Sequence, residues 1–570
     1  MKLRPRSALA LFTLAFGLLA AGRAGATDYY VATAGSPGAA GSNNNAGTSA
    51  AAPFATIARA VQLVQPGDTI FLRGGTYATY SIPLRSGQPV SGTASAWITF
   101  SAYPGELPIF DGALGDFGTG FGSTSSQFIR VVGIASRNFG SSGFGNGWVN
   151  DVGTSNGNWQ FINCIADNNK INGVTFYNAT GLLIDQSIVA HNGNANPSWS
   201  SGVNLFHVSG DFTTNIVRRT VSFENIDVST THSTPAGGAT DGSGFILDQS
   251  SSGALFENNI GFRNGGSCIR INTPGAHIIN NTCYHDGLNP IDRTPANPGE
   301  IYFSNGLQGA VVSNNLLAAS GFNNTMPAVN IMSGTANILV NANGATPFFA
   351  NPGALDFHLV ATASAEIDKG TATGAPATDI GFDPKCIKAQ TPQAGQPSWW
   401  TFTIDYDYIT QTAKGVAGCF HPSTRPAGAA PDIGAYEFNG VPIPGTGGAP
   451  GSGGATGAGG VTGAGGARGT GGISGGAGGA RGTGGASAGS GGASAGTGGA
   501  TSSGAGGSAV TGAGGETGAA GSTGAAGEGS GETGAAGGCQ CAVAAERGGA
   551  VVLPIAMLFA ALVVARRRRR

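Results

Sequence analysis

The sequence has 570 residues, a formal net charge of −2 and only 10% charged side chains. Bulk electrostatics would therefore not attract nucleic acid or an acidic polymer, and any ligand must be bound at a local site. Glycine contributes 101 residues, but many of them lie in one block from Gly445 to Gly538, and the remainder has the composition of a folded protein.

The N-terminus, residues 1–26, is predicted to be a signal peptide. Basic residues come first, the apolar run LALFTLAFGLLA follows, and Ala24 and Ala26 then stand where signal peptidase prefers small side chains. The alternative is an uncleaved anchor, but the apolar run is short for a membrane span. We therefore expect an exported protein.

Seven cysteines occur in this chain, and disulfides can persist in an exported protein. Five of them lie in the folded part, so at least one stays unpaired there: Cys164, Cys268, Cys283, Cys386 and Cys419. Cys386 and Cys419 fall together in the last irregular section and form the best candidate pair. The sequence leaves the connectivity open.

A repeat occupies the middle of the chain. Aligning its apolar-Asn step gives successive separations of 23, 33, 39, 22 and 34 residues between these positions: Asn163, Gln186, Arg219, Asn258, Asn280 and Asn314. A shortest period of 22 to 23 residues predicts a solenoid, and it leaves no room for a helix in each unit. Each unit also has a second alternating segment, such as GVNLF at 202 or CIRIN at 268, so the sequence predicts a parallel β-helix.

The Asn-Asn steps at the corners are predicted to be structural, because stacked amides can bond one another and Asn tolerates a bent backbone. Three insertions, which start at residues 193, 224 and 287, leave the same corner of the coil. Stacked insertions would form a wall beside the next sheet, and in repeat proteins such a face often binds the ligand.

The segment TIARAVQLV at 56–64 has helical apolar spacing and can cover the first open coil. Residues 29–77, together with the closing segment DFHLVATASAEIDKG through RPAGAAPDIGAYEF, resemble the pectate-lyase superfamily over about residues 29–438. The resemblance implies an all-β, right-handed, single-stranded parallel β-helix. The superfamily includes lyases, hydrolases, epimerases and non-enzymatic surface proteins, so activity remains open.

Alternation along the second strand of each coil predicts which side chains face outward. The inward set is Val174, Val203, Phe245, Ile269, Ile301 and Val329, and their neighbours, from Thr175 and Asn204 to Ile246, Arg270, Tyr302 and Asn330, are expected to face solvent. Asp248, Arg270, Glu300 and Tyr302 would then lie on neighbouring coils beside the wall, with Asp241 at the loop edge.

This face could bind an acidic sugar. Tyr177, Phe206 and Tyr302 offer flat surfaces for pyranose rings, Asn272 lies on the same face, and Arg270 can bind a carboxylate in bidentate fashion. The carboxylates of Asp241, Asp248 and Glu300 supply the oxygen ligands that Ca²⁺ prefers. The alternative is an ordinary solvated face with a salt bridge between coils.

The resemblance implies β-elimination on uronic-acid polymers, for which a base must remove the proton next to the carboxylate. Lys170, the one lysine of the coils, is the candidate base but lies roughly three coils from Arg270, and Arg270 suits a carboxylate clamp better than a base. The aspartate run of Ca²⁺-dependent pectate lyases is missing. Asp248 with Glu300, near 10 Å apart by rung spacing, gives glycoside hydrolysis as a lower-ranked option.

The other candidate function is a non-catalytic adhesin or carbohydrate-binding surface protein, which the low charge and the isolated lysine favour. The histidines show no close ligand-like spacing, so a zinc site is disfavoured. The partner is thus expected to be a uronic-acid polymer or a cell-surface glycan, the cofactor Ca²⁺ or none, and the protein a monomer.

Residues 440–538 consist of Gly, Ala, Ser and Thr units with almost no large apolar side chain, which predicts a flexible tether after a β-helix domain at 27–439. Residues 539–570 contain Cys539, Cys541, an apolar transmembrane stretch and five terminal arginines. This order resembles the sorting signals of myxobacterial surface proteins. It implies processing or lipidation at a cysteine and display on the surface of a Gram-negative cell; a plain membrane anchor is the alternative.

Overall fold

The computed structural model describes most of the predicted β-helix domain. The described residues are 25–113, 118–146, 156–193, 199–227, 241–288, 300–304, 309–319, 338–341, 348–411 and 418–443. Nearly all of the predicted tether lies outside them, as do Cys539, Cys541, the apolar tail and nearly all of the predicted signal peptide. Among the residues that the structure describes, no helix has the length and apolar character needed to cross a membrane.

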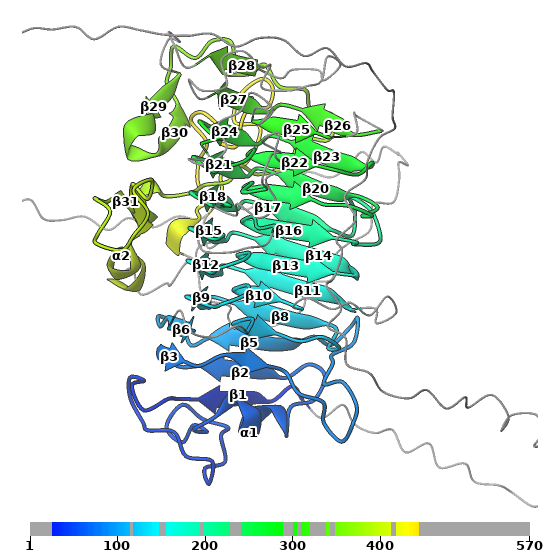
Figure 1. The fold of residues 1–570 in the computed structure, drawn as a ribbon, viewed down its shortest axis with the longest axis vertical. Coiled ribbons are helices and arrows are strands. Elements are labelled where there is room, and N and C mark those ends of the chain that lie inside the picture. The colour runs from blue at the N-terminus through cyan, green and yellow to red at the C-terminus, as the bar shows by residue number, and fades with distance from the viewer. Residues whose placement is uncertain are drawn as a thin grey trace, which may run out of the picture. The chain divides into compact units, whose positions relative to one another are not determined.

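The chain winds through three parallel sheets, and the strands of each sheet follow one another along a common axis in Figure 1. Sheet A contains β1 (Asp28–Val31), β2 (Thr69–Leu72), β5 (Ile98–Ala102), β8 (Ile129–Val132), β11 (Asn156–Ile162), β14 (Ala179–Asp185), β17 (Ile216–Arg218), β20 (Ala254–Glu257), β23 (Ala276–Ile279) and β26 (Val311–Ser313). Sheet B contains β3 (Gly75–Tyr77), β6 (Pro108–Asp111), β9 (Ala135–Arg137), β12 (Ile165–Asp167), β15 (Ile188–Ala190), β18 (Val221–Phe223), β21 (Ile260–Phe262), β24 (Thr282–Tyr284), β27 (Leu316–Ala319) and β28 (Ile338–Asn341). Sheet C contains β4 (Tyr80–Ser81), β7 (Phe121–Gly122), β10 (Phe144–Gly145), β13 (Val174–Tyr177), β16 (Val203–Phe206), β19 (Phe245–Leu247), β22 (Ile269–Ile271) and β25 (Ile301–Phe303).

One strand from each sheet makes one coil, as β14, β15 and β16 do, and each strand pairs in parallel with its counterpart in the next coil. The inward side chains of all three sheets are mostly apolar and form one continuous core, with the buried Ser136 and Ser222 as polar exceptions on sheet B. The predicted parallel β-helix is therefore confirmed. Its first open coil is covered by α1 (Ile57–Val61), which is shorter than the predicted helical segment and begins after the N-cap Thr56.

The corner from sheet A to sheet B explains the repeated motif. All six positions of the aligned column have a positive φ, between 46° and 56°, which is the left-handed conformation that bends the chain sharply: Asn163, Gln186, Arg219, Asn258, Asn280 and Asn314. Asparagine tolerates this conformation better than most residues. The column is thus set by backbone geometry, as the motif predicted.

Side-chain amides stack at the corners, directly after the left-handed residues. At the first corner Asn259 Nδ2 donates to Asn281 Oδ1 at 3.0 Å, and Asn281 Nδ2 donates to Asn315 Oδ1 at 2.9 Å. A longer ladder follows the second corner, from sheet B to sheet C, through Asn169, Asn192, Asn225, Asn264 and Asp286. Buried amides that bond between coils satisfy polar groups that would otherwise be unpaired, which confirms their structural role.

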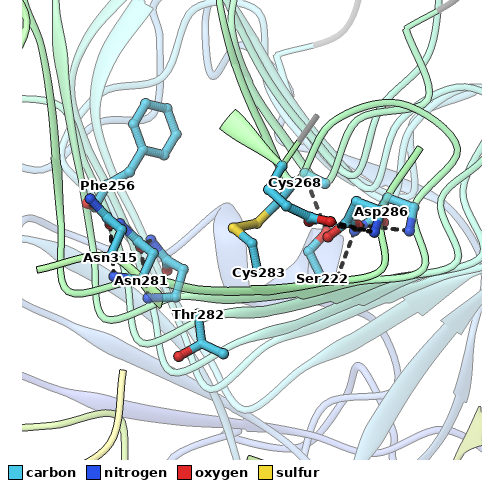
Figure 2. The surroundings of a disulfide bond; sticks show 12 residues. Ser222, Phe256, Cys268, Asn281, Thr282, Cys283, Asp286 and Asn315 are labelled. Atoms are coloured by element: carbon cyan, nitrogen blue, oxygen red, sulfur yellow. Dashed lines mark hydrogen bonds between the residues drawn. A yellow bond between two sulfur atoms is a disulfide. The ribbon is translucent and has the colours of Figure 1, made fainter. Parts of the chain in front are cut away.

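Two disulfides are present in the described residues. Cys386 pairs with Cys419, as the sequence suggested, and Cys268 pairs with Cys283, while Cys164 is a buried free thiol. Figure 2 shows the Cys268–Cys283 bond in the interior, between the corner that holds Asn281 and Asn315 and the corner that holds Asp286. It joins the start of sheet C in one coil to sheet B in the next.

The segment after the coils packs on the outside of sheet B. It contains β29 (Phe349–Asn351), η2 (Pro352–Ala354), β30 (Asp356–Leu359), η3 (Pro384–Cys386), β31 (Ile387–Ala389), β32 (Phe402–Ile404) and α2 (Tyr406–Gln411). Figure 1 shows β31 and α2 beside the sheet B strands β12 to β18. Apolar side chains of sheet B, such as Phe223 and Phe262, share a buried cluster with this segment.

Candidate functional site

The outer face of sheet C lies next to the second corner, from which the predicted insertions leave. The stacked amides at Asn192, Asn225 and Asn264 show that successive coils turn at equivalent positions there. The insertion residues 194–198, 228–240 and 289–299 themselves lie outside the described residues. The described part of the face therefore consists of sheet C and the residues that flank these loops.

Strand register confirms the predicted alternation on sheet C. Val203, Phe245, Ile269 and Ile301 pair in one buried inward row, and the outward row contains Thr175, Asn204, Ile246, Arg270 and Tyr302. Thr175, Asn204 and Ile246 are nevertheless only 2%, 3% and 0% exposed, so the prediction that they face solvent was wrong. Val329 and Asn330 lie outside the described residues. Alternation determines which face a side chain occupies, and it does not reveal whether that face is covered.

Six side chains on this face form what we call the Arg270 cluster: Asp241, Asp248, Arg270, Asn272, Tyr302 and Ser304. Arg270 Nη1 donates to Asp241 Oδ1 at 3.0 Å, and Arg270 Nε donates to Asn272 Oδ1 at 3.2 Å. The guanidinium carbon lies 5.7 Å from the centre of the Tyr302 ring. Charge, amide and aromatic contacts thus fix the orientation of Arg270.

Asn272 connects the two parts of the cluster. Its Nδ2 donates to Asp248 Oδ1 at 2.9 Å, and its Oδ1 also accepts from Ser304 Oγ at 2.8 Å. Asp248, Asn272 and Ser304 each follow the last residue of a sheet C strand, so they occupy the same position in successive coils. Sequence reasoning had placed Asn272 on this face but had missed its bridging role and the contribution of Ser304.

The cluster is largely enclosed. Asp241 is 5% exposed and Asp248 is 8% exposed, whereas the Arg270 side chain keeps 17% of its surface exposed. Burial raises the pKa of Asp241 to about 7; the Arg270 guanidinium opposes this rise, and the Asp248 charge adds to it. A buried carboxyl with such a pKa, beside a cation on a sheet face, is typical of a functional site.

Glu300 does not join the Arg270 cluster. Its side chain is 1% exposed and lies at the end of the long amide ladder, where the backbone N–H of Asp286 donates to its carboxylate at 3.3 Å. Burial and the neighbouring Asp286 raise the pKa of Glu300 well above its usual range. The ladder positions repeat along the sequence, so Asp286 could have been recognised as the residue equivalent to Asn264.

Lys170 and the two aromatic residues also lie away from Arg270. Lys170 precedes β13, and β22, which carries Arg270, is three strands further along sheet C. This separation is roughly 14 Å at the usual strand spacing. Tyr177 and Phe206 stack on each other with their ring centres 4.9 Å apart, and Phe206 lies two strands from Arg270.

The predicted Ca²⁺ ligands do not converge on a common point. Asp241 Oδ1 contacts Arg270, Asp248 Oδ1 accepts from Asn272 and from the backbone N–H of Gln249, and Glu300 contacts Asp286. Within the described part of the chain, no three His, Cys, Asp or Glu side chains are grouped closely enough to hold a metal ion. These residues therefore do not fit the divalent-cation site expected from the sequence.

Comparison with known proteins agrees with this fold. Residues 29–264 match the family model described as "Pel9A-like, right handed beta helix region". Over this region, which is less than half of the chain, the sequence is similar to that family. Pectate lyase PEL9 of Emericella nidulans is 43% identical over 88 residues, which are 15% of this chain and 19% of that protein, so the chain spans about a fifth of that relative.

Solved structures with similar folds include two lyases. Pectate lyase Pel9A has a TM-score of 0.45 and 19% identity, and the match covers 73% of this chain and 98% of that chain. An alginate lyase from Paenibacillus sp. has a TM-score of 0.30 and 16% identity, with 50% and 94% coverage. Both TM-scores lie below 0.5 and both identities lie below 25%.

Proposed function

We propose that this protein binds a uronic-acid polysaccharide on the outer face of sheet C and that Arg270 binds the sugar carboxylate. The observation that carries the proposal is the fixed guanidinium, held between Asp241, Asn272 and the Tyr302 ring. A planar guanidinium can bind a carboxylate through two parallel hydrogen bonds. Because its orientation is already set, little conformational entropy is lost on binding.

The same face offers surfaces for the neighbouring sugar rings. Tyr302 lies one strand from Arg270, and Phe206 lies two strands away on the other side. Tyr177, on the next strand, is only 5% exposed and supports the Phe206 ring from beneath the surface. Successive strands are about 4.8 Å apart, so a polysaccharide that runs along the solenoid axis would meet Tyr302, Arg270 and Phe206 in turn. Aromatic faces supply apolar contact area to the C–H groups of pyranose rings.

Cleavage by β-elimination is the activity we propose for this face. In that step a base takes the proton from C5, the C–H electrons form the C4–C5 double bond, and the C4–O bond breaks with the leaving oxygen protonated. Arg270 would stabilise the negative charge that develops on the carboxylate. Asp241 is the carboxylate in contact with Arg270, which makes it the candidate base among the described residues.

Non-catalytic binding is the second candidate function. The observation that favours it is the position of Lys170, the lysine predicted as a base, three strands from Arg270. An adhesin would still use the Arg270 cluster to bind the carboxylate, and it would release no product. The two functions therefore differ in product formation and agree in the residue that binds the ligand.

The test uses purified full chain with pectate, alginate and other uronic-acid polymers. Product formation is followed by the ultraviolet absorbance of the unsaturated ends, and binding by affinity electrophoresis in the same polymers. β-Elimination predicts product from the wild type and loss of at least about 100-fold in rate for Arg270→Ala. Lys170→Ala is the matched control and should keep its rate.

Binding without product would support the adhesin. Neither binding nor product from any of the polymers would refute both functions. We also propose that the protein is displayed on the cell surface through its C-terminal tail. Labelling of intact cells should then reach the β-helix domain, and replacing Cys539 and Cys541 together should release or mislocalise it.

A further inference from the structure

We infer that Arg270 supplies the positive charge for carboxylate recognition as a fixed part of the chain, so the uronate site works without a divalent cation. This inference rests on the proposed function and specifies how the same face recognises its ligand. It departs from the Ca²⁺ site that the sequence suggested.

One oxygen of each carboxylate in the cluster already faces a donor. Asp241 Oδ1 lies 3.0 Å from Arg270 Nη1, so the atom beside it is a cationic nitrogen. Asp248 Oδ1 accepts from Asn272 Nδ2 at 2.9 Å and from the backbone N–H of Gln249 at 2.7 Å. A Ca²⁺ site needs several oxygens that point at one centre, and here Asp241 Oδ1 faces the guanidinium whereas Asp248 Oδ1 faces an amide and a backbone N–H.

Arg270 also retains the means to bind a ligand. A guanidinium has five N–H groups, and its hydrogen bonds to Asp241 and Asn272 use two of them. The side chain keeps 17% of its surface exposed, in contrast to the more deeply buried Asp241. The remaining N–H groups are therefore the cationic donors of the cluster that a uronate carboxylate could contact.

A lysine would not provide the same arrangement. Its ammonium group is a compact charge without a planar fork, so it could not contact Asp241 and Asn272 in this geometry and also present a second edge to a carboxylate. The inference therefore predicts that Arg270→Lys loses most of the binding, although the net charge of the site is unchanged. A site that needed only positive charge would accept this substitution.

The experiment measures binding of oligogalacturonate and oligoalginate to the full chain by isothermal titration calorimetry, with EDTA and then with added Ca²⁺. We expect the Kd of the wild type to change less than about twofold between the two conditions. Arg270→Ala should weaken binding by roughly 30-fold or more in both, because truncating a desolvated charge partner is costly. Arg218→Ala is the matched control, since it removes an arginine paired with Asp185.

The outcomes separate the inference from the proposed function. Wild-type binding that EDTA abolishes and Ca²⁺ restores would overturn the inference and leave the proposed function intact. Equal binding by wild type and Arg270→Ala in EDTA would also overturn it. If neither oligosaccharide binds under either condition, the proposed function fails and the inference fails with it. Circular dichroism of each variant shows whether the β-helix has kept its fold.

Discussion

His191 fastens the C-terminal segment to the coils, and its charge should make that contact sensitive to pH. Its ring is 3% exposed; Nδ1 lies 2.8 Å from Asp167 Oδ1, and Nε2 lies 3.0 Å from the Phe402 carbonyl oxygen and 3.3 Å from Glu224 Oε2. Both nitrogens face acceptors, so both must carry hydrogen. The ring is therefore an imidazolium in the folded protein.

The size of the effect follows from the pKa. Burial alone would lower the pKa of His191, but the hydrogen bonds to Asp167 and Glu224 outweigh it and raise the pKa from 6.5 to about 9. At 1.36 kcal/mol per pKa unit, the shift corresponds to about 3 kcal/mol. Because the folded pKa is the higher one, this stability is fully present below pH 6.5 and is lost as the pH rises to about 9.

Other charged and polar groups lie beside His191 and contribute to the electrostatic energy of the same contact. Glu224 also accepts from Arg263 Nε at 3.1 Å, and Asp167 accepts from the Tyr406 hydroxyl at 3.2 Å. The Arg137 guanidinium lies over the Tyr406 ring. These groups remain when His191 is replaced, so the difference between wild type and His191→Gln isolates the imidazolium.

Hydrogen exchange of the β32 amides reports this contact locally. Between pH 6.5 and 9 the wild type should lose about 100-fold in protection at β32 beyond any loss in His191→Gln, since about 3 kcal/mol corresponds to two powers of ten. His277→Gln, which removes a histidine on β23 in sheet A, is the control and should follow the wild type. Identical pH profiles for wild type and His191→Gln would refute the imidazolium assignment.

Three further changes test the coil itself by urea unfolding. Asn225→Leu removes the acceptor of the buried Asn192 backbone N–H and side-chain amide, and one donor to Asn264 Oδ1, so the unfolding free energy should fall by about 3 kcal/mol. Asp286→Asn should raise stability above pH 7, because burial raises the pKa of Asp286 to about 7 and the folded state therefore resists its charge beside Glu300. Gly145→Ala should cost at least about 2 kcal/mol, because φ is 138° and a Cβ would meet the Thr175 carbonyl oxygen.

The β-helix could be predicted from the sequence because the residues that form its corners and strands are close in sequence and recur from coil to coil. A left-handed residue bends the chain at the first corner of all six aligned coils, and a stacking amide follows it in three of them, at Asn259, Asn281 and Asn315, so the motif recurs along the sequence. The inward and outward rows of sheet C could also be assigned from the sequence, because the inward positions in this sheet are apolar. Register then placed Arg270 beside Tyr302, as the sequence had predicted.

The composition of the cluster could not be predicted to the same depth. Glu300 lies one residue before β25, at a corner, where alternation no longer determines the direction of a side chain. It turns to Asp286, which ends the amide ladder, and so leaves the face on which the sequence had placed it. The burial of Ile246 could not be predicted either, because strand alternation places the side chain on the outward face and does not reveal whether that face is covered.

The outer face of sheet B and the corner between sheets A and B are already engaged by the protein itself, which favours sheet C, where the Arg270 cluster lies, as the binding face. On sheet B, His191 and Glu224 hold the segment that carries β32. At the corner of sheets A and B, Arg425 from the end of the domain donates to Asn258 at 2.8 Å. The Arg270 cluster, by contrast, draws all of its contacts described above from sheet C and the residues that flank it, so its charge is the one that a ligand on this face could use.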